Sequence, residues 1–171
     1  MGKVCLDKLG SNITAGCTIP VNGVKNIYLM HAEDVTFSAS SSGVLTVATF
    51  TSTGKSYMVE GYKQNIQVTS AIRTMDASNK LDISVMFKMP ATNAYMRSIL
   101  TGRFYVMVGY NDLTYSMVGV TSPLECTGMD NDSNANGKLY TITLTAPDGS
   151  VGNYYTPVAS AVITTIVAKS V

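Results

Sequence analysis

Residues 64–89 carry the pattern that most constrains what this chain folds into. Apolar side chains recur at every second position along two arms of the segment, and polar side chains lie between them. Asp76 and Asn79 stand between the arms, and these residue types tolerate the left-handed and Asx-turn geometries of tight turns. Such alternation around a turn predicts an antiparallel hairpin with one apolar and one polar face. The apolar positions are Ile66, Val68, Ile72, Leu81, Ile83, Val85 and Phe87.

Composition extends the β prediction to the rest of the chain. Charged residues make up 13% of the 171 residues, against about 25% in an average protein. Serine and threonine are abundant instead, and strands use them on exposed faces where helices use Glu, Lys and Arg. A chain of this length suits one domain over residues 1–171. Residues 1–23 are expected to form an N-terminal arm, and residues 153–171 a C-terminal arm or the last strands.

Further short segments alternate in the same way, at residues 44–50, 103–108, 114–120 and 138–146. Residues 26–31 and 35–37 are expected to form one strand or two, and residues 56–62 another. Both sets of alternate residues in 44–50 are apolar, which predicts a strand that is covered on two sides. Residues 123–128 are interpreted as a less regular piece and 129–137 as a polar loop, while 161–167 are last strands or a tail that seeks a partner.

Residues 91–100 break the alternation and predict the only helix. Tyr95 with Ile99, and Met96 with Leu100, are spaced four apart and share a stripe. Gly102 follows at the position where glycine ends helices. Together these signals predict a mainly β protein, an antiparallel β-sandwich or barrel with one short flanking helix.

Charge and hydropathy exclude several classes of function. The formal net charge of +1, with scattered lysines and arginines, excludes a general polyanion binder. No run of about 18 apolar residues exists, so no membrane span is expected. The mean hydropathy of +0.17 is high, and such chains often hide apolar surface against partner subunits. Three cysteines without close spacing indicate reduced thiols rather than a disulfide framework.

No residue pattern indicates an enzyme, a cofactor or a catalytic residue. The single histidine, His31, has Glu33 and Asp34 close by, but no nucleophile stands on a shaped turn. We interpret His31 as a residue at the end of a strand. The ten tyrosines are irregularly spaced and no Trp is present, which favours strand packing over stacking platforms for sugars or bases.

The acidic loop at residues 130–134 is the best metal candidate. Asp130, Asp132 and Asn134 place oxygen atoms at alternate positions, as a calcium loop does. The pattern then departs, because Ala135 stands where the turn glycine belongs and Thr141 where a bidentate Glu is needed. A solvated loop between strands is therefore the favoured interpretation, and no metal is expected.

The order of these segments resembles the tail-tube-type virion proteins of tailed bacteriophages. The long hairpin leads into the short helix, and then come residues 103–112 (RFYVMVGYND), a second hairpin, and residues 137–144 (GKLYTITL). The resemblance covers about two thirds of the chain and implies a β-sandwich with a flanking helix. It also implies copies that join into a ring, usually a hexamer, with inner strands that form a continuous barrel. Stacked rings would be a conduit for DNA in a tail or tail connector.

On this resemblance the protein is a non-enzymatic virion subunit, assembled in the host cytoplasm, whose partners are its own copies and other virion proteins. DNA is only passing cargo, and a sparsely charged wall suits its passage. Two alternatives remain open from the sequence: a capsid decoration or head-fibre protein, and a carbohydrate-binding β-sandwich. The residues expected to line the lumen are Asn65, Gln67, Thr69, Asp82 and Ser84.

Overall fold

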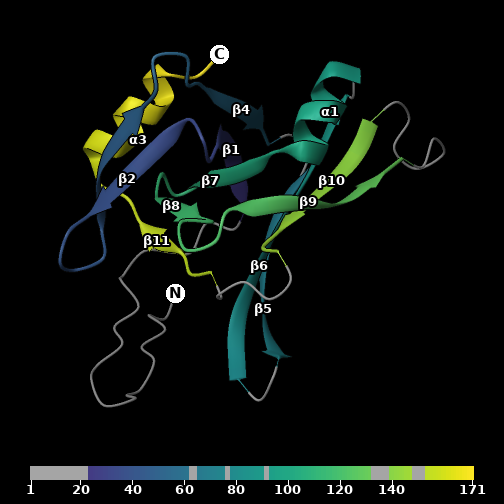
Figure 1. Cartoon of the computed structure of the whole chain (residues 1–171), viewed down its shortest axis with the longest axis horizontal. Coiled ribbons are helices and arrows are strands. Elements are labelled where there is room, and N and C mark those ends of the chain that lie inside the picture. The colour runs from purple at the N-terminus through teal and green to yellow at the C-terminus, as the bar shows by residue number, and fades with distance from the viewer. Residues whose placement is uncertain (1–22, 62–64, 76–77, 91–92, 132–138, 148–152) are drawn as a thin grey trace, which may run out of the picture.

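The computed structural model describes residues 23–61, 65–75, 78–90, 93–131, 139–147 and 153–171. Its strands and helices follow one another as Figure 1 labels them. The strands are β1 Val24–His31, β2 Val35–Ala39, β3 Leu45–Phe50, β4 Ser56–Glu60, β5 Ile66–Met75, β6 Ser78–Pro90, β7 Arg103–Tyr110, β8 Tyr115–Val118, β9 Leu124–Asp130, β10 Leu139–Thr145 and β11 Thr156–Pro157. The helices are α1 Asn93–Thr101 and α3 Ser160–Ala168.

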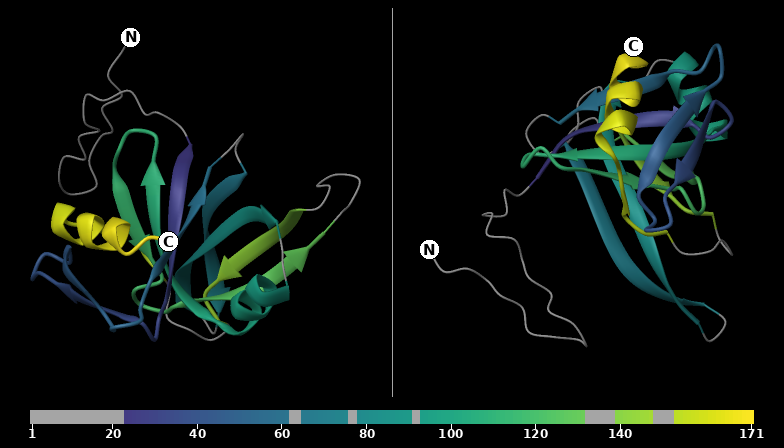
Figure 2. Two further views of the ribbon diagram at one scale, coloured as in Figure 1. Left: turned by 90° about the horizontal axis from the view of Figure 1, so that it is seen from above. Right: turned by 90° about the vertical axis from the view of Figure 1, so that its left-hand side faces the viewer.

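β7 organises a nine-stranded antiparallel sheet. β1 pairs along one edge of β7 and carries β4 on its far side. Along the other edge β8 pairs with residues 106–109 of β7, and β9 follows at Arg103 and Phe104. β9 then leaves β7 to pair with β10, which pairs with β6 and through it with β5. The sheet therefore has a first half (β11, β8, β7, β1, β4) and a second half (β9, β10, β6, β5) that meet at the β7–β9 contact (Figures 1 and 2).

The turn between β8 and β9, where the chain passes from one half to the other, needs glycine. Gly119 has a φ of +93°, a conformation that residues with a Cβ rarely adopt. A Cβ at this position would also lie 3.0 Å from the carbonyl oxygen of Phe104. The close approach of β9 to the start of β7 therefore depends on the missing side chain.

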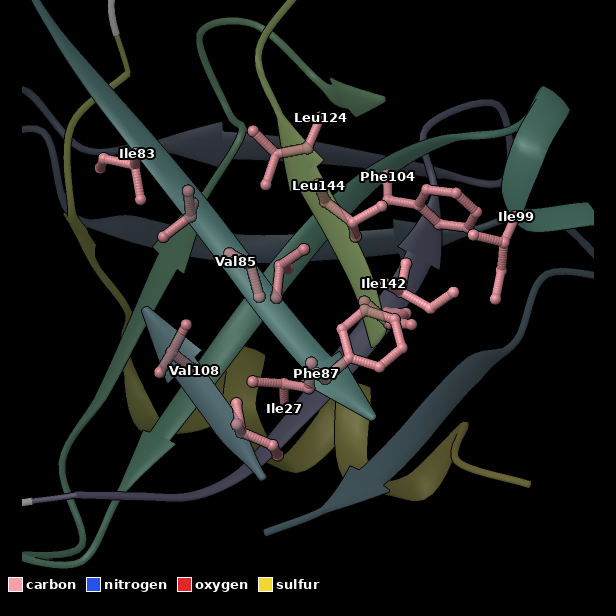
Figure 3. Close-up of a cluster of buried hydrophobic side chains, with 14 of the residues drawn as sticks. Ile27, Ile83, Val85, Phe87, Ile99, Phe104, Val108, Leu124, Ile142 and Leu144 are labelled. Atoms are coloured by element: carbon pink, nitrogen blue, oxygen red, sulfur yellow. The ribbon is translucent and has the colours of Figure 1, made fainter. Parts of the chain in front are cut away.

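The first hydrophobic core lies between the two halves of the sheet (Figure 3). β1 and β7 send every second residue into it, and β6 and β10 send theirs from the opposite side. The side chains are aliphatic or phenyl groups with almost no accessible surface, so their burial is the main source of stability for the sandwich. Its fully buried members include Ile27, Val85, Phe87, Val106, Val108, Leu124, Ile142 and Leu144.

A second core covers the opposite face of β1, β7 and β8. Tyr28 and Met30 alternate with the first-core residues of β1 and point into it, as Met107 does from β7. The β2–β3 hairpin and α3 form the covering layer, through Val35, Leu45, Val162 and Ile166. The first half of the sheet is thus covered on both faces, which explains why five consecutive residues of β1 are buried.

The mainly β, antiparallel fold class is confirmed, and so are its clearest elements. The hairpin predicted over residues 64–89 forms as β5 and β6 with one continuous register, from Ile66 opposite Phe87 to Met75 opposite Ser78. The helix predicted at residues 91–100 is present as α1, Asn93–Thr101. No helix in the described part of the chain is long and apolar enough to cross a lipid bilayer.

The prediction of strands or a partner-seeking tail at residues 161–167 was wrong, as was the expectation of a single helix. α3 forms there although its sequence is rich in β-branched residues, which generally favour strands. Val162 and Ile166, four residues apart, are both buried in the second core. The Ser56 hydroxyl donates to the Ile166 carbonyl at 2.7 Å, and the Thr164 hydroxyl donates within the helix. Tertiary packing overrides the local preference here.

Two strand predictions also need correction. Residues 124–130 are strand β9 rather than an irregular piece that runs into a loop. A register shift opposite Thr143 and Leu144 leaves one extra residue in β9, so its inward residues are Leu124, Cys126 and then Met129. β3 is covered on one side only, because it belongs to the outermost layer and leaves Val47 50% exposed.

Candidate functional site

A groove of about 650 Å³ opens at the end of the sandwich beside α1. Its walls include the buried side chains Leu29, Ile99 and Phe104, and the last residue, Val171, also lines it. His31, Tyr57, Glu60 and Lys88 contribute its ionisable side chains. The groove is therefore mostly apolar with a few polar groups, which is the usual character of a small-ligand or side-chain pocket. No sequence pattern indicated it, because its residues come from β1, β4, β6, α1, β7 and β10.

His31 is held by aromatic packing in this groove. Its imidazole lies 4.7 Å from the Phe104 ring centroid and 6.3 Å from that of Tyr57. Within the described residues, no carboxylate lies within hydrogen-bonding distance of the ring, and Asp34 instead accepts a hydrogen bond from the Thr51 hydroxyl at 3.4 Å. The neighbouring acids that made His31 a candidate therefore do not form a catalytic pair with it.

The metal candidate is only partly described. Asp130 is exposed at the end of β9, and Asp132 and Asn134 lie outside the described residues. The Asn131 amide donates to the Leu139 carbonyl at 2.7 Å and so ties β9 to β10. Over the ranges that the structure describes, no three His, Cys, Asp or Glu side chains are grouped closely enough to hold a metal ion.

Cys126 is half-buried on β9, and burial raises the pKa of its thiol. A hydrogen bond to the Gly128 carbonyl, at 3.4 Å between sulfur and oxygen, partly opposes that shift. The thiolate needed for nucleophilic or metal chemistry is thus disfavoured. Cys5 and Cys17 lie outside the described residues.

The five residues expected to line a lumen share one face of the β5–β6 hairpin. Thr69 stands opposite Ser84, and Asp82 lies two residues from Ser84 along the same face. Gln67 precedes Thr69 at an alternate position on β5, and Asn65, just before the strand, continues the same alternation and accepts a hydrogen bond from the Lys88 amide. We call this the outer face, because the opposite face continues into the first core. Arg73 and Lys80, which stand opposite each other, and Lys88, which stands opposite Asn65, share this face, so it is polar and carries more positive than negative charges.

The hairpin extends beyond the sandwich that supports its base (Figure 1). β10 pairs with β6 only from Pro90 to Val85, whereas β5 and β6 stay paired for seven further positions, to Met75 and Ser78. On the inner face, Ile66 is buried near the base, but Ile72 is 72% exposed. The outer end of this strong apolar pattern therefore lies where no other described element of the chain covers it.

β5 is also the last strand of its half of the sheet, so one of its edges has no partner strand among the described residues. The Lys88 amide donates to the Asn65 carbonyl, which sets the phase of the ladder. Backbone groups of Ile66, Val68, Ser70, Ile72 and Thr74 therefore point to the open edge.

β4 ends the other half of the sheet but is partly covered. The Ser56 amide donates to the Lys169 carbonyl, and the Val171 amide donates to the Ser56 carbonyl.

A cluster of tyrosines lies where the hairpin leaves the body. The hydroxyls of Tyr155 and Ser70 are hydrogen-bonded, and Tyr110 is a close neighbour of Tyr155. Burial raises the pKa of Tyr155, the Tyr110 hydroxyl raises it further, and the Ser70 bond lowers it. We call Ser70, Tyr110 and Tyr155 the Tyr110–Tyr155 cluster. The irregular spacing of these residues in the sequence concealed this arrangement.

No family model, curated protein or solved structure matches this chain. The assignment of a function therefore depends on the residues and geometry described above.

Proposed function

We propose that the protein is a non-enzymatic structural subunit that assembles with copies of itself into rings, as part of a phage tail or tail-connector conduit for DNA. The observation that carries the proposal is the projecting β5–β6 hairpin with its open β5 edge. Exposed strand edges are templates for pairing with another chain, and natural monomers usually blunt them with charges, prolines or bulges. The open edge of β5 has no proline, and its register with β6 is unbroken.

The outer face of the hairpin supports the conduit part of the proposal. Asn65, Gln67 and Thr69 offer amides and a hydroxyl, and Asp82 adds one negative charge. DNA-binding proteins hold phosphates with arginines and lysines, and that attraction slows passage. The five residues carry no positive charge that would hold phosphates, although Arg73, Lys80 and Lys88 stand on the same face. The five residues serve in this proposal as the wall of the conduit.

The test is to remove the pairing edge while leaving the hairpin intact. Ile72→Pro removes a backbone donor that points to the open edge and makes no hydrogen bond to β6. Ile72→Thr is the matched control, because it removes the same apolar side chain but keeps the donor. We expect wild type and Ile72→Thr to form rings or filaments in negative-stain micrographs and Ile72→Pro to remain monomeric by light scattering.

Three results, from this experiment or from binding assays with capsid shells and glycans, contradict the proposal. A wild-type protein that stays monomeric at high concentration overturns ring assembly. Discrete trimers or monomers that bind only a capsid shell favour the decoration or head-fibre alternative. Glycan binding that depends on the exposed Tyr154 and on calcium favours the carbohydrate-binding alternative.

A further inference from the structure

On the inner face of the hairpin the described fold leaves one large apolar side chain, Ile72, 72% exposed. Ile66 and Ile83 are buried in or near the first core, and Val68 and Leu81 pack at its margin. Ile72, which stands opposite Leu81, is beyond that margin and mostly exposed. An isolated two-stranded ribbon is marginally stable in water, so a projecting hairpin gains from an apolar cover.

The described chain begins beside this face. The Gly23 carbonyl accepts a hydrogen bond from the Asn111 amide at 3.2 Å, and Val24 pairs with Tyr110 of the Tyr110–Tyr155 cluster. Tyr110 neighbours Tyr155, and Tyr155 is hydrogen-bonded to Ser70 on the inner face. Residues 1–22 therefore join the body two side chains away from the hairpin.

The length and composition of residues 1–22 suit this surface. An extended segment of 22 residues reaches roughly 70 Å, whereas the ten residues of β5 span roughly 33 Å. The segment carries only three charged side chains among its 22 residues. Its aliphatic side chains are Val4, Leu6, Leu9, Ile13, Ile19 and Val21.

We propose that residues 1–22 dock on the inner face of the β5–β6 hairpin of the same chain, around Ile72 and Leu81. Attachment at Gly23 gives the segment an effective concentration near millimolar at this face, which favours its own hairpin over that of a second copy. The docked aliphatic side chains cover Ile72, and the segment supplies the layer that the hairpin lacks beyond the sandwich. This inference does not depend on ring assembly.

Disulfide trapping in the full chain tests the proposal, because residues 1–22 carry two of the three native cysteines, Cys5 and Cys17. Cys126→Ser removes the third. In that background, Ile72→Cys places a thiol on the inner face, and Ala71→Cys is the matched control on the outer face of the same strand. Both positions are exposed, so neither change disturbs the core. Mild oxidation at low protein concentration is followed by peptide mapping.

We expect an intrachain link from position 72 to Cys5 or Cys17 that forms about tenfold faster than any link from position 71, because docking holds the thiols together. Equal rates at the two positions overturn the proposal. Links found only between chains, in dimer bands that grow with concentration, also overturn it. A monomeric protein with the intrachain link sustains this inference and contradicts ring assembly, so the two proposals fail separately.

Discussion

β1 and β5 belong to the same sheet, yet their environments are opposite. β1 buries both faces, since Ile27 and Leu29 enter the first core and Tyr28 and Met30 enter the second. β5 buries only the base of one face, and its residues 69–72 are exposed. β1 has apolar side chains on both faces, whereas β5 alternates apolar and polar residues, so the sequences already favour different burial. The exposure of Ile72 is the part that the sequence of β5 does not decide, because it depends on where the covering layer ends.

The largest expected effect is on the free energy of unfolding, and it comes from replacing an isoleucine by alanine at a buried position of the hairpin rather than at an exposed one. Ile83→Ala removes a fully buried side chain from the first core and should lower the free energy of unfolding by about 2–5 kcal/mol. Ile72→Ala makes the same change on the same face near the tip and should cost less than Ile83→Ala, because the described fold leaves Ile72 72% exposed and only the docked residues 1–22 would cover it. Urea denaturation of both variants measures the difference. Equal losses would show that the tip is as well covered as the base.

Substitution of two glycines compares the β8–β9 turn, which contains Gly119, with the β2–β3 hairpin, which contains Gly43. Gly119→Ala and Gly43→Ala both force an L residue to positive φ, which costs roughly 1–2 kcal/mol each. At Gly119 the added Cβ also presses on the Phe104 carbonyl, whereas Gly43 has open space around it. We therefore expect Gly119→Ala to lose about 1 kcal/mol more stability than Gly43→Ala. Thermal unfolding of the two variants side by side tests this order, and equal losses would show that the β8–β9 turn relaxes around the added methyl group.

The smallest expected effect is a pH dependence of the doubly covered region. Burial raises the pKa of Tyr28 above its ordinary value of 10.0, and nearby Tyr115 raises it further. The folded state then keeps its proton more tightly than the unfolded state, so this contribution is fully present below pH 10 and declines as the pH rises through the folded pKa. Tyr28→Phe should lose less stability between pH 8 and roughly pH 10.5 than wild type does.

The control for this measurement is Tyr154→Phe, which alters a tyrosine that is 61% exposed. Urea midpoints should fall between the two pH values by the same amount in Tyr154→Phe as in wild type. If Tyr28→Phe shows the wild-type decline as well, the buried hydroxyl does not link stability to pH.

The sequence pattern predicted the strands in which apolar and polar residues alternate without interruption. β5 and β6 have an unbroken register, and β10 alternates around buried Ile142 and Leu144, so period two is visible directly in their sequences. β9 could not be recognised from its pattern, because its extra residue reverses the phase of the alternation midway. α3 could not be recognised either, because its residues prefer strands, and only the second core makes a helix the better packing of Val162 and Ile166.

The candidate sites divide in the same way. The outer face of the hairpin was predictable, because alternation alone places Asn65, Gln67 and Thr69 on one side. The groove at His31 and the Tyr110–Tyr155 cluster could not be predicted, because each gathers residues that are distant in the sequence. Contacts of that kind depend on how the two halves of the sheet fold over each other.

The amino-acid sequence by itself determined that this protein is a mainly β chain with a long amphipathic hairpin and little surface charge. Alternation and composition are local properties, and strands follow from them through side-chain direction alone. The tertiary structure decided which strands lie between two layers, that residues 160–168 form a helix, and that Ile72 lies outside the core. These outcomes depend on the fold at the β7–β9 contact, because burial is shared between segments and no single segment encodes its own cover.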